Sequence, residues 1–258
     1  MSQVKLYKEY RENPGKPELV LLHGWGMTGQ VWGPFADQLA EYFSLTIIDL
    51  PGLGRSQEFP TPYTLDAVLD LLVEQVPESA IWLGWSMGGQ IAVAFADRFP
   101  ARVEKLITIA SNPCFVQRDD WPSAMDEATH QAFEVSLAQN QKKTLTRFVM
   151  LQTQGAEAGR DILKTLKVIL SDVEHTAAEE SLALLRLDQR PELKNLAVPV
   201  LHLFGEVDHL VPNSAAEASQ SISGGEVVTY AGAGHLPFLS HQADVVADIL
   251  GFVQGDQS

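Results

Sequence analysis

The chain has 258 residues, of which 45% are hydrophobic and 20% charged, ordinary proportions for a globular protein. Its formal net charge of −15 argues against nucleic acid and anionic membrane surfaces as partners, because their phosphates require a cationic surface. The single cysteine, Cys114, cannot form an internal disulfide, which favours a reducing compartment.

From the first residue onward, short apolar runs alternate with helical patterns. The N-terminal 18 residues carry charges throughout, unlike a secretion signal, and no later run reaches the ~18 apolar residues of a membrane span. We therefore expect a cytoplasmic protein, acting as a monomer. Six apolar runs that end in small, polar or glycine residues are predicted to be buried strands: 19–26, 44–54, 79–86, 103–111, 198–208 and 226–235.

Helical periodicity occupies the segments that separate or follow these runs, namely 31–42, 64–76, 87–98, 213–222 and 241–254. Buried strands that alternate with helices predict an α/β fold, in which a mostly parallel sheet carries helices on both faces.

One long segment breaks this alternation. Residues 116–186 show helical patterns and no convincing strand. We expect a core formed by residues 1–115 and 187–258, with 116–186 inserted as a helical cap or lid. Because ligands of parallel sheets bind beyond the carboxyl ends of the strands, a cap at that edge would cover a site.

The pentapeptide Gly84-Trp85-Ser86-Met87-Gly88 lies between a predicted strand and a predicted helix. This order is the nucleophile elbow of the α/β-hydrolases, where a strained turn exposes the serine hydroxyl. Both glycines are expected because a Cβ atom would clash with the crossing backbone. A pentapeptide of this kind also occurs by chance in tight turns that have no catalytic role. Whether Ser86 is a nucleophile therefore depends on whether the chain supplies a base and an acid for it.

A base and an acid for Ser86 both follow later strands. In this fold the chain order is serine, acid, histidine, and Asp208 and His235 come just past strand ends in that order. Glu206 and Asp188 are competing acids, and strand alternation puts Glu206 on the same side as Asp208. We prefer Asp208, because it lies beyond the strand end, where the loop can turn toward a histidine.

Donors for the oxyanion of an acyl-transfer reaction are expected in two loops. The segment His23-Gly24-Trp25-Gly26 ends a strand, so the backbone N–H groups of Trp25 and Met87 are the predicted pair. His23 is expected to hold its loop by hydrogen bonds. No zinc-ligand spacing occurs, so we expect neither a metal nor a cofactor. The implied reaction is ester hydrolysis through an acyl-enzyme.

The whole chain resembles the α/β-hydrolase superfamily. The segments LLHGWGM, DLPGLGRS, AIWLGWSMGG, SNPCF, DDWP and RFVMLQTQG are more closely similar to the biotin-pathway carboxylesterases, the pimeloyl-acyl-carrier-protein methyl ester esterases. The resemblance implies removal of the methyl group from a pimeloyl methyl ester on acyl carrier protein, with Ser86, Asp208 and His235 as the triad. It implies substrate contacts at Trp25, Ser86, Met87, His235, Phe148, Val149, Met150, Leu151 and Gln152.

Methionine departs from the family pattern at position 87, where leucine is expected, and it is common there in perhydrolase-like and other small esterases. A general short-acyl carboxylesterase and a carbon–carbon bond hydrolase of the same fold therefore stay as alternatives.

A basic stretch within the proposed cap supports an acidic partner. Residues 141–167 contain six basic and two acidic side chains, in a chain whose net charge is −15. Lys143 and Arg147 are four apart, as are Arg160 and Lys164, so each pair can share a helix face. Acyl carrier proteins are acidic, and we expect these four side chains to dock one. A solvated helix face without a partner is the alternative.

Overall fold

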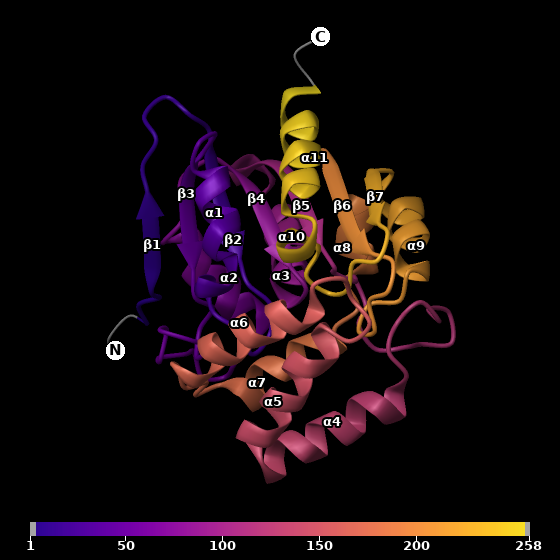
Figure 1. Cartoon of the computed structure of the whole chain (residues 1–258). Helices are drawn as coiled ribbons and strands as arrows, with labels where there is room; N and C mark the ends of the chain where they lie inside the picture. Colours follow the sequence, from indigo (N-terminus) through magenta and orange to yellow (C-terminus); the bar gives the residue numbers. More distant parts are fainter. Residues whose placement is uncertain (1–3, 256–258) are drawn as a thin grey trace.

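The computed structural model describes residues 4–255, and within this range the strands form one seven-stranded sheet (Figure 1). The strand order across the sheet is β1-β3-β2-β4-β5-β6-β7. The strands are β1 (Lys8–Arg11), β2 (Glu18–Leu22), β3 (Ser44–Ile48), β4 (Ala80–Trp85), β5 (Val103–Ile109), β6 (Val200–Gly205) and β7 (Glu226–Tyr230). Only the edge pair of β1 and β3 is antiparallel among the described strands. The predicted mostly parallel sheet is confirmed.

The six predicted strands are all present, although each ends earlier than its apolar run suggested. In the run 44–54, for example, the strand stops at Ile48 and the remainder is loop. The edge strand β1 was missed because its sequence, KEYR, offers no apolar signal. It pairs with β3 through its backbone, with Tyr10 opposite Thr46, and its side chains are exposed or half-buried.

Helices cover both faces of this sheet, as the alternation predicted. Alternate residues of each strand point to opposite faces and enter two separate apolar clusters. One cluster joins the sheet to α1 (Gly33–Leu39) and α11 (Gln242–Gln254). The other joins it to α2 (Leu65–Val73), α3 (Met87–Arg98), α8 (Arg190–Asn195) and α9 (Ser214–Ser223). The short helix α10 (Pro237–Ser240) precedes α11.

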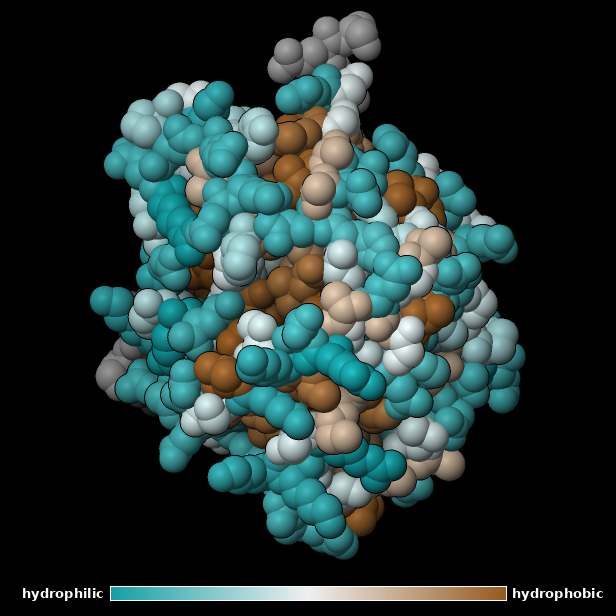
Figure 2. Space-filling view, viewed as in Figure 1, coloured by the Kyte–Doolittle hydropathy of each residue, from teal (hydrophilic) through white to brown (hydrophobic). Residues whose placement is uncertain are grey.

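Between β5 and β6 the chain forms four further α-helices: α4 (Glu127–Gln139), α5 (Gln141–Gln152), α6 (Gly159–Ser171) and α7 (Ala178–Leu182). They lie together beyond one end of the strands (Figure 1). In Figure 2 apolar side chains show through the polar surface across the middle of this face, where α6 meets the sheet layer. None of the helices among residues 4–255 is both long and apolar enough to cross a membrane.

The segment before α7 ties these helices to loops at the carboxyl ends of the strands. The indole N–H of Trp25, in the loop after β2, donates to the carbonyl of Ala178 over 3.0 Å. The N–H of Ala177 donates to the carbonyl of Gly52, again over 3.0 Å. The helices therefore sit directly over the loops in which the candidate residues were predicted.

Candidate active site

Ser86 occupies the sharp turn between β4 and α3. Its φ of +54° lies in the left-handed region, a conformation that costs a residue with a side chain about 1–3 kcal/mol. Four hydrogen bonds hold the backbone there. The N–H donates to the carbonyl of Ile109 (2.8 Å). The carbonyl accepts from the N–H groups of Gly89 (2.9 Å) and Gln90 (3.2 Å) and from the hydroxyl of Ser111 (2.8 Å). The strained turn presents the serine side chain beyond the end of the sheet.

The two glycines of the pentapeptide are required by close backbone crossings. A Cβ on Gly84 would lie 2.5 Å from the carbonyl carbon of Gly88 and closer still to its oxygen. One on Gly88 would lie 2.6 Å from the carbonyl oxygen of His23 and closer to that of Leu22. These contacts explain why glycine occurs on both sides of Ser86.

Gly88→Ala is therefore expected to lower the free energy of unfolding by about 3 kcal/mol, because backbone atoms cannot move aside as a flexible side chain can. Gly251→Ala is the matched control, since nothing lies within 4 Å of a Cβ there. Within α11, that change should stabilise by about 0.5–1 kcal/mol. Urea unfolding of both variants measures the difference. Equal stability of the two variants would contradict the crowding at Gly88.

His235 and Asp208 are brought together by the loops after β7 and β6. The Nδ1 of His235 lies 2.7 Å from Oδ2 of Asp208, and both side chains are 1% exposed. The other carboxylate oxygen, Oδ1, accepts from the N–H groups of Leu210 (2.8 Å) and Val211 (3.1 Å). Because a carboxylate can only accept, Nδ1 carries the ring hydrogen. The Nε2 atom is left as an acceptor, buried and without a partner among the described residues.

The backbone of His235 is fixed from two sides. Its carbonyl accepts from the indole N–H of Trp85 (2.8 Å), the residue before Ser86. Its N–H donates to the carbonyl of Gln152 in α5 (3.2 Å). The histidine is thus tied both to the serine turn and to the helices over it.

The two competing acids lie elsewhere. Glu206 is exposed, and its Oε2 accepts from the N–H of Gly232. Asp188 pairs with Arg190 at 2.6 Å, and hydrogen bonds from that guanidinium hold the pKa of Asp188 below its usual range. Of the three acids considered from the sequence, the structure places only Asp208 against His235.

The predicted oxyanion donors border the serine. A Cβ on Gly24 would lie 3.2 Å from Cβ of Ser86, so the loop that carries Trp25 passes directly beside the serine. Met87 is the first residue of α3, and its N–H therefore has no acceptor within the helix. No hydrogen bond from either N–H occurs within residues 4–255.

His23 braces this loop, as expected. Its Nε2 accepts from the N–H of Leu50 (2.9 Å), and its Nδ1 donates to the carbonyl of Gly24 (2.8 Å). Burial lowers the pKa of His23, which keeps the ring neutral in this arrangement. Because both ring nitrogens are occupied, His23 has none left to serve Ser86 as a second base.

The five consecutive α5 residues expected to contact substrate point in different directions, because successive helical residues are about 100° apart. Phe148 packs edge-on against Trp25, with ring centroids 5.1 Å apart. Gln152 is buried, and neither polar atom of its amide has a partner in the described chain. By contrast, Val149 packs into the apolar cluster on the α1 and α11 side, and Met150 is 50% exposed.

A cavity of about 450 Å³ opens between α4, α5 and α7. Phe148 and Leu151 line it, as do the predicted docking residues Lys143 and Arg147. Leu210, whose N–H donates to Asp208, also lines it. Three further apolar residues that line the cavity were missed from the sequence, and the only signal for them is apolar positions in the helical segment 116–186: Phe133, Leu182 and Leu185.

The other two predicted docking residues, Arg160 and Lys164, are exposed on α6, outside the lining of this cavity. The structure thus places Lys143 and Arg147 on one helix and Arg160 and Lys164 on the next. Within residues 4–255, no cluster of three or more His, Cys, Asp or Glu side chains could hold a metal ion.

Comparisons with known proteins agree with this fold. Residues 19–249 match the alpha/beta hydrolase family. Among curated proteins, the pimeloyl-[acyl-carrier protein] methyl ester esterase of Pectobacterium atrosepticum is 40% identical over 94% of this chain and 96% of its own. The esterase of the same name from Edwardsiella ictaluri is 41% identical over 93% of this chain and 95% of its own. The solved esterase EaEST from Exiguobacterium antarcticum shares the fold, with a TM-score of 0.86, 24% identity, and coverage of 96% of this chain and 95% of its own.

Proposed function

This chain belongs to the alpha/beta hydrolase family, and we propose that it hydrolyses the methyl ester of pimeloyl-acyl carrier protein, a step in biotin biosynthesis. It is a carboxylic ester hydrolase, like the curated relatives that match almost its whole length. The observation that carries the mechanism is the buried hydrogen bond between His235 and Asp208, which leaves Nε2 of His235 without a partner in the described chain. The carbonyl of the same histidine accepts from Trp85, the residue before Ser86.

In the proposed mechanism, Nε2 of His235 takes the proton of Ser86 as Oγ attacks the ester carbonyl. The tetrahedral intermediate collapses, the C–O bond to the methoxy group breaks, and methanol leaves with the proton from His235. Water then attacks the acyl-enzyme and gives a proton to Nε2, which returns it to Oγ of Ser86 as the acid is released. Asp208 holds the ring and stabilises its charged form. The reaction as written needs only water as co-reactant.

The N–H groups of Trp25 and Met87 are proposed to bind the oxyanion of both tetrahedral intermediates. Neither has an acceptor in the described chain, and the helix that begins at Met87 adds its positive end. Preorganised donors of this kind are worth about 3–4 kcal/mol each in other enzymes, because they need not reorient as charge develops.

We propose that residues 116–186 act as the cap and that the 450 Å³ cavity receives the acyl chain or its carrier arm. Phe148 and Leu151 line this cavity, and we propose that they contact substrate together with Gln152, whose carbonyl accepts from the N–H of His235. Val149 and Met150, at which the resemblance also implies substrate contacts, would act instead through the packing and solvation of α5.

The exposed cations Lys143, Arg147, Arg160 and Lys164 are proposed to dock the acidic carrier protein. Two of them line the cavity, so a bound carrier would be held where its arm enters. Cationic patches of this kind raise association rates by 10 to 1,000-fold, an effect that salt screens. We further propose a monomeric cytoplasmic enzyme that binds neither nucleic acid nor membranes, in keeping with its net charge of −15.

The proposal is tested by steady-state hydrolysis of pimeloyl-acyl carrier protein methyl ester and of p-nitrophenyl acetate. Charge reversal in the double variant Arg147→Glu and Arg160→Glu is expected to lower kcat/KM for the carrier-bound ester by about 10 to 100-fold. Hydrolysis of the small ester should stay within about twofold, because it does not need the carrier.

The matched control reverses two exposed lysines elsewhere, Lys5→Glu with Lys16→Glu, which changes the net charge equally. This variant should hydrolyse the carrier-bound ester like the wild type. If both substrates fell equally in the Arg147/Arg160 variant, the basic side chains would not be a docking site. If the wild type hydrolysed small esters and left the carrier-bound ester intact, a general short-acyl esterase would replace the proposal.

A further inference from the structure

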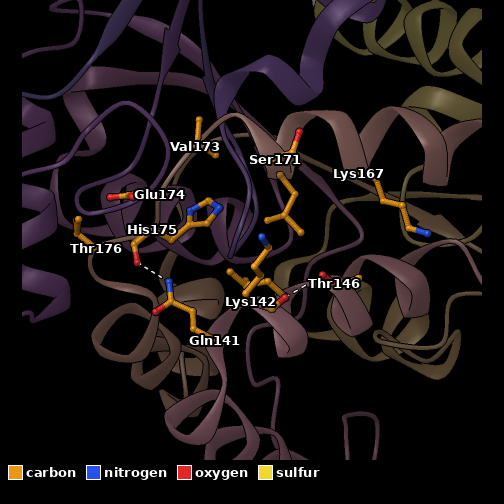
Figure 3. A pocket seen from close by; sticks show the side chains of 11 residues that line it. Gln141, Lys142, Thr146, Lys167, Ser171, Val173, Glu174, His175 and Thr176 are labelled. Carbon is orange, nitrogen blue, oxygen red and sulfur yellow. Dashed lines mark hydrogen bonds between the residues drawn. The ribbon is translucent and has the colours of Figure 1, made fainter.

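A second cavity, of about 610 Å³, opens on the other side of α5, between that helix and α6 (Figure 3). The segment 172–176, which leads from α6 toward α7, closes its third side. Its volume lies within the roughly 300–1,000 Å³ of small-molecule sites in general. None of Ser86, Asp208 and His235 lines it, and the proposed reaction gives it no role.

One of the residues that line this cavity is a buried histidine with an unused hydrogen-bond donor. His175 is 4% exposed, and its Nδ1 lies 3.3 Å from the backbone N of Gly54. Because a backbone N–H can only donate, Nδ1 must accept, and the hydrogen of the neutral ring is on Nε2. Burial lowers the pKa of His175 to about 4, so the ring is neutral at pH 7.

The Nε2–H group of His175 has no acceptor among the described residues. A buried donor that stays unpaired is costly to the fold, and a native structure normally supplies a partner from the chain, from water or from a ligand. An acceptor atom in the cavity would satisfy it.

The remaining lining combines positive charge with an apolar wall. Lys142 and Lys167 contribute two cations from α5 and α6, against the one carboxylate of Glu174. Figure 3 shows the side chain of Lys142 in the middle of the view, with the ring of His175 beside it. Leu145, Leu170 and Val173 supply apolar surface to the same cavity. One net positive charge beside an apolar wall suits a singly charged, amphipathic anion.

We propose that this cavity binds a small organic carboxylate with an apolar chain. The carboxylate accepts from Nε2–H of His175 and pairs with the ammonium of Lys142, while the chain covers Leu145, Leu170 and Val173. This site is separate from the ester-hydrolysing residues and does not depend on the function proposed above. A multiply charged phosphate would find one net positive charge and would leave the apolar wall uncovered.

The test is a titration of the wild-type protein with hexanoate, observed through the ring nitrogen signals of its histidines by NMR. The signal of His175 is identified by its absence in His175→Gln. We expect a saturable shift of Nε2 of His175, and about tenfold weaker binding in Lys142→Met, which removes a charge-assisted contact. Lys194→Met, at an exposed lysine on α8, is the matched control and should bind like the wild type.

Hexylammonium and hexan-1-ol separate the contribution of the carboxylate to binding from that of the apolar chain. Both share the apolar tail, and both should bind at least about tenfold more weakly than hexanoate, since neither carries a carboxylate. An unchanged His175 signal at saturating hexanoate would overturn the proposal, as would equal affinity in Lys142→Met. A shift confined to His235 would place the anion at the ester-hydrolysing residues and would also overturn it. Ester hydrolysis is not the readout, so failure here leaves the proposed function untouched.

Discussion

Ser86→Ala is expected to lower kcat/KM for ester hydrolysis by about 10⁵ to 10⁶-fold, a loss typical of removing a serine nucleophile. The reason is that Ser86 carries the only hydroxyl in the turn between β4 and α3, residues 85–88. The backbone bonds that hold position 86 do not involve its side chain, so the variant should keep its thermal midpoint within a few degrees. Initial rates on p-nitrophenyl acetate and circular dichroism melting measure the two effects.

Ser111→Ala is the control for this change. Its hydroxyl donates to the backbone carbonyl of Ser86, so its loss disturbs the turn and leaves the nucleophile in place. The expected loss of kcat/KM is about tenfold or less, as for a single neutral hydrogen bond. A fluorophosphonate should add its mass to the wild type and to Ser111→Ala, and not to Ser86→Ala. Retention of labelling or of full activity in Ser86→Ala would assign the nucleophile to another residue.

How far the sequence predicted the fold depends on whether a local signal exists. Buried strands such as β4 and β6 can be predicted from the sequence, because a strand that is covered on both faces has a continuously apolar run of residues. The edge strand β1 has no such run and is held by its backbone bonds to β3. The orientation of α5 also depends on packing against several neighbours, which is why Phe148 meets Trp25 whereas Met150 points to solvent.

The choice between Glu206 and Asp208 shows a different limit. Alternation places residues two apart on the same side only while a strand continues. Strand β6 ends at Gly205, and the N–H of Val207 donates to the carbonyl of Ala233 rather than to a strand partner. The chain turns there, so Asp208 reaches His235 while Glu206 bonds Gly232. The contact of His175 with Gly54 joins residues 121 positions apart, and no local pattern indicates it.

Asp208→Asn is expected to lower kcat by about 10⁴-fold with little loss of stability, because it changes which ring nitrogen of His235 carries the hydrogen. The asparagine oxygen can keep the bonds from the N–H groups of Leu210 and Val211. Its NH₂ group then faces Nδ1 at the position of the present carboxylate oxygen. An NH₂ group donates, so Nδ1 must accept and the hydrogen moves to Nε2. A protonated Nε2 cannot take the proton of Ser86.

Glu206→Gln and Asp188→Asn make the same chemical change at the two other acids considered from the sequence, and kcat should stay within about threefold in both. Glu206 bonds the N–H of Gly232, which a glutamine oxygen can also accept, and Asp188 pairs with Arg190 away from His235. Steady-state rates of the three variants on one small ester at pH 7 make the comparison direct. A large loss of kcat in Glu206→Gln with normal activity in Asp208→Asn would assign the role of the acid to Glu206. All three substitutions replace a carboxylate by its amide and differ only in position. A comparison of the three variants therefore tests which acid is in contact with His235.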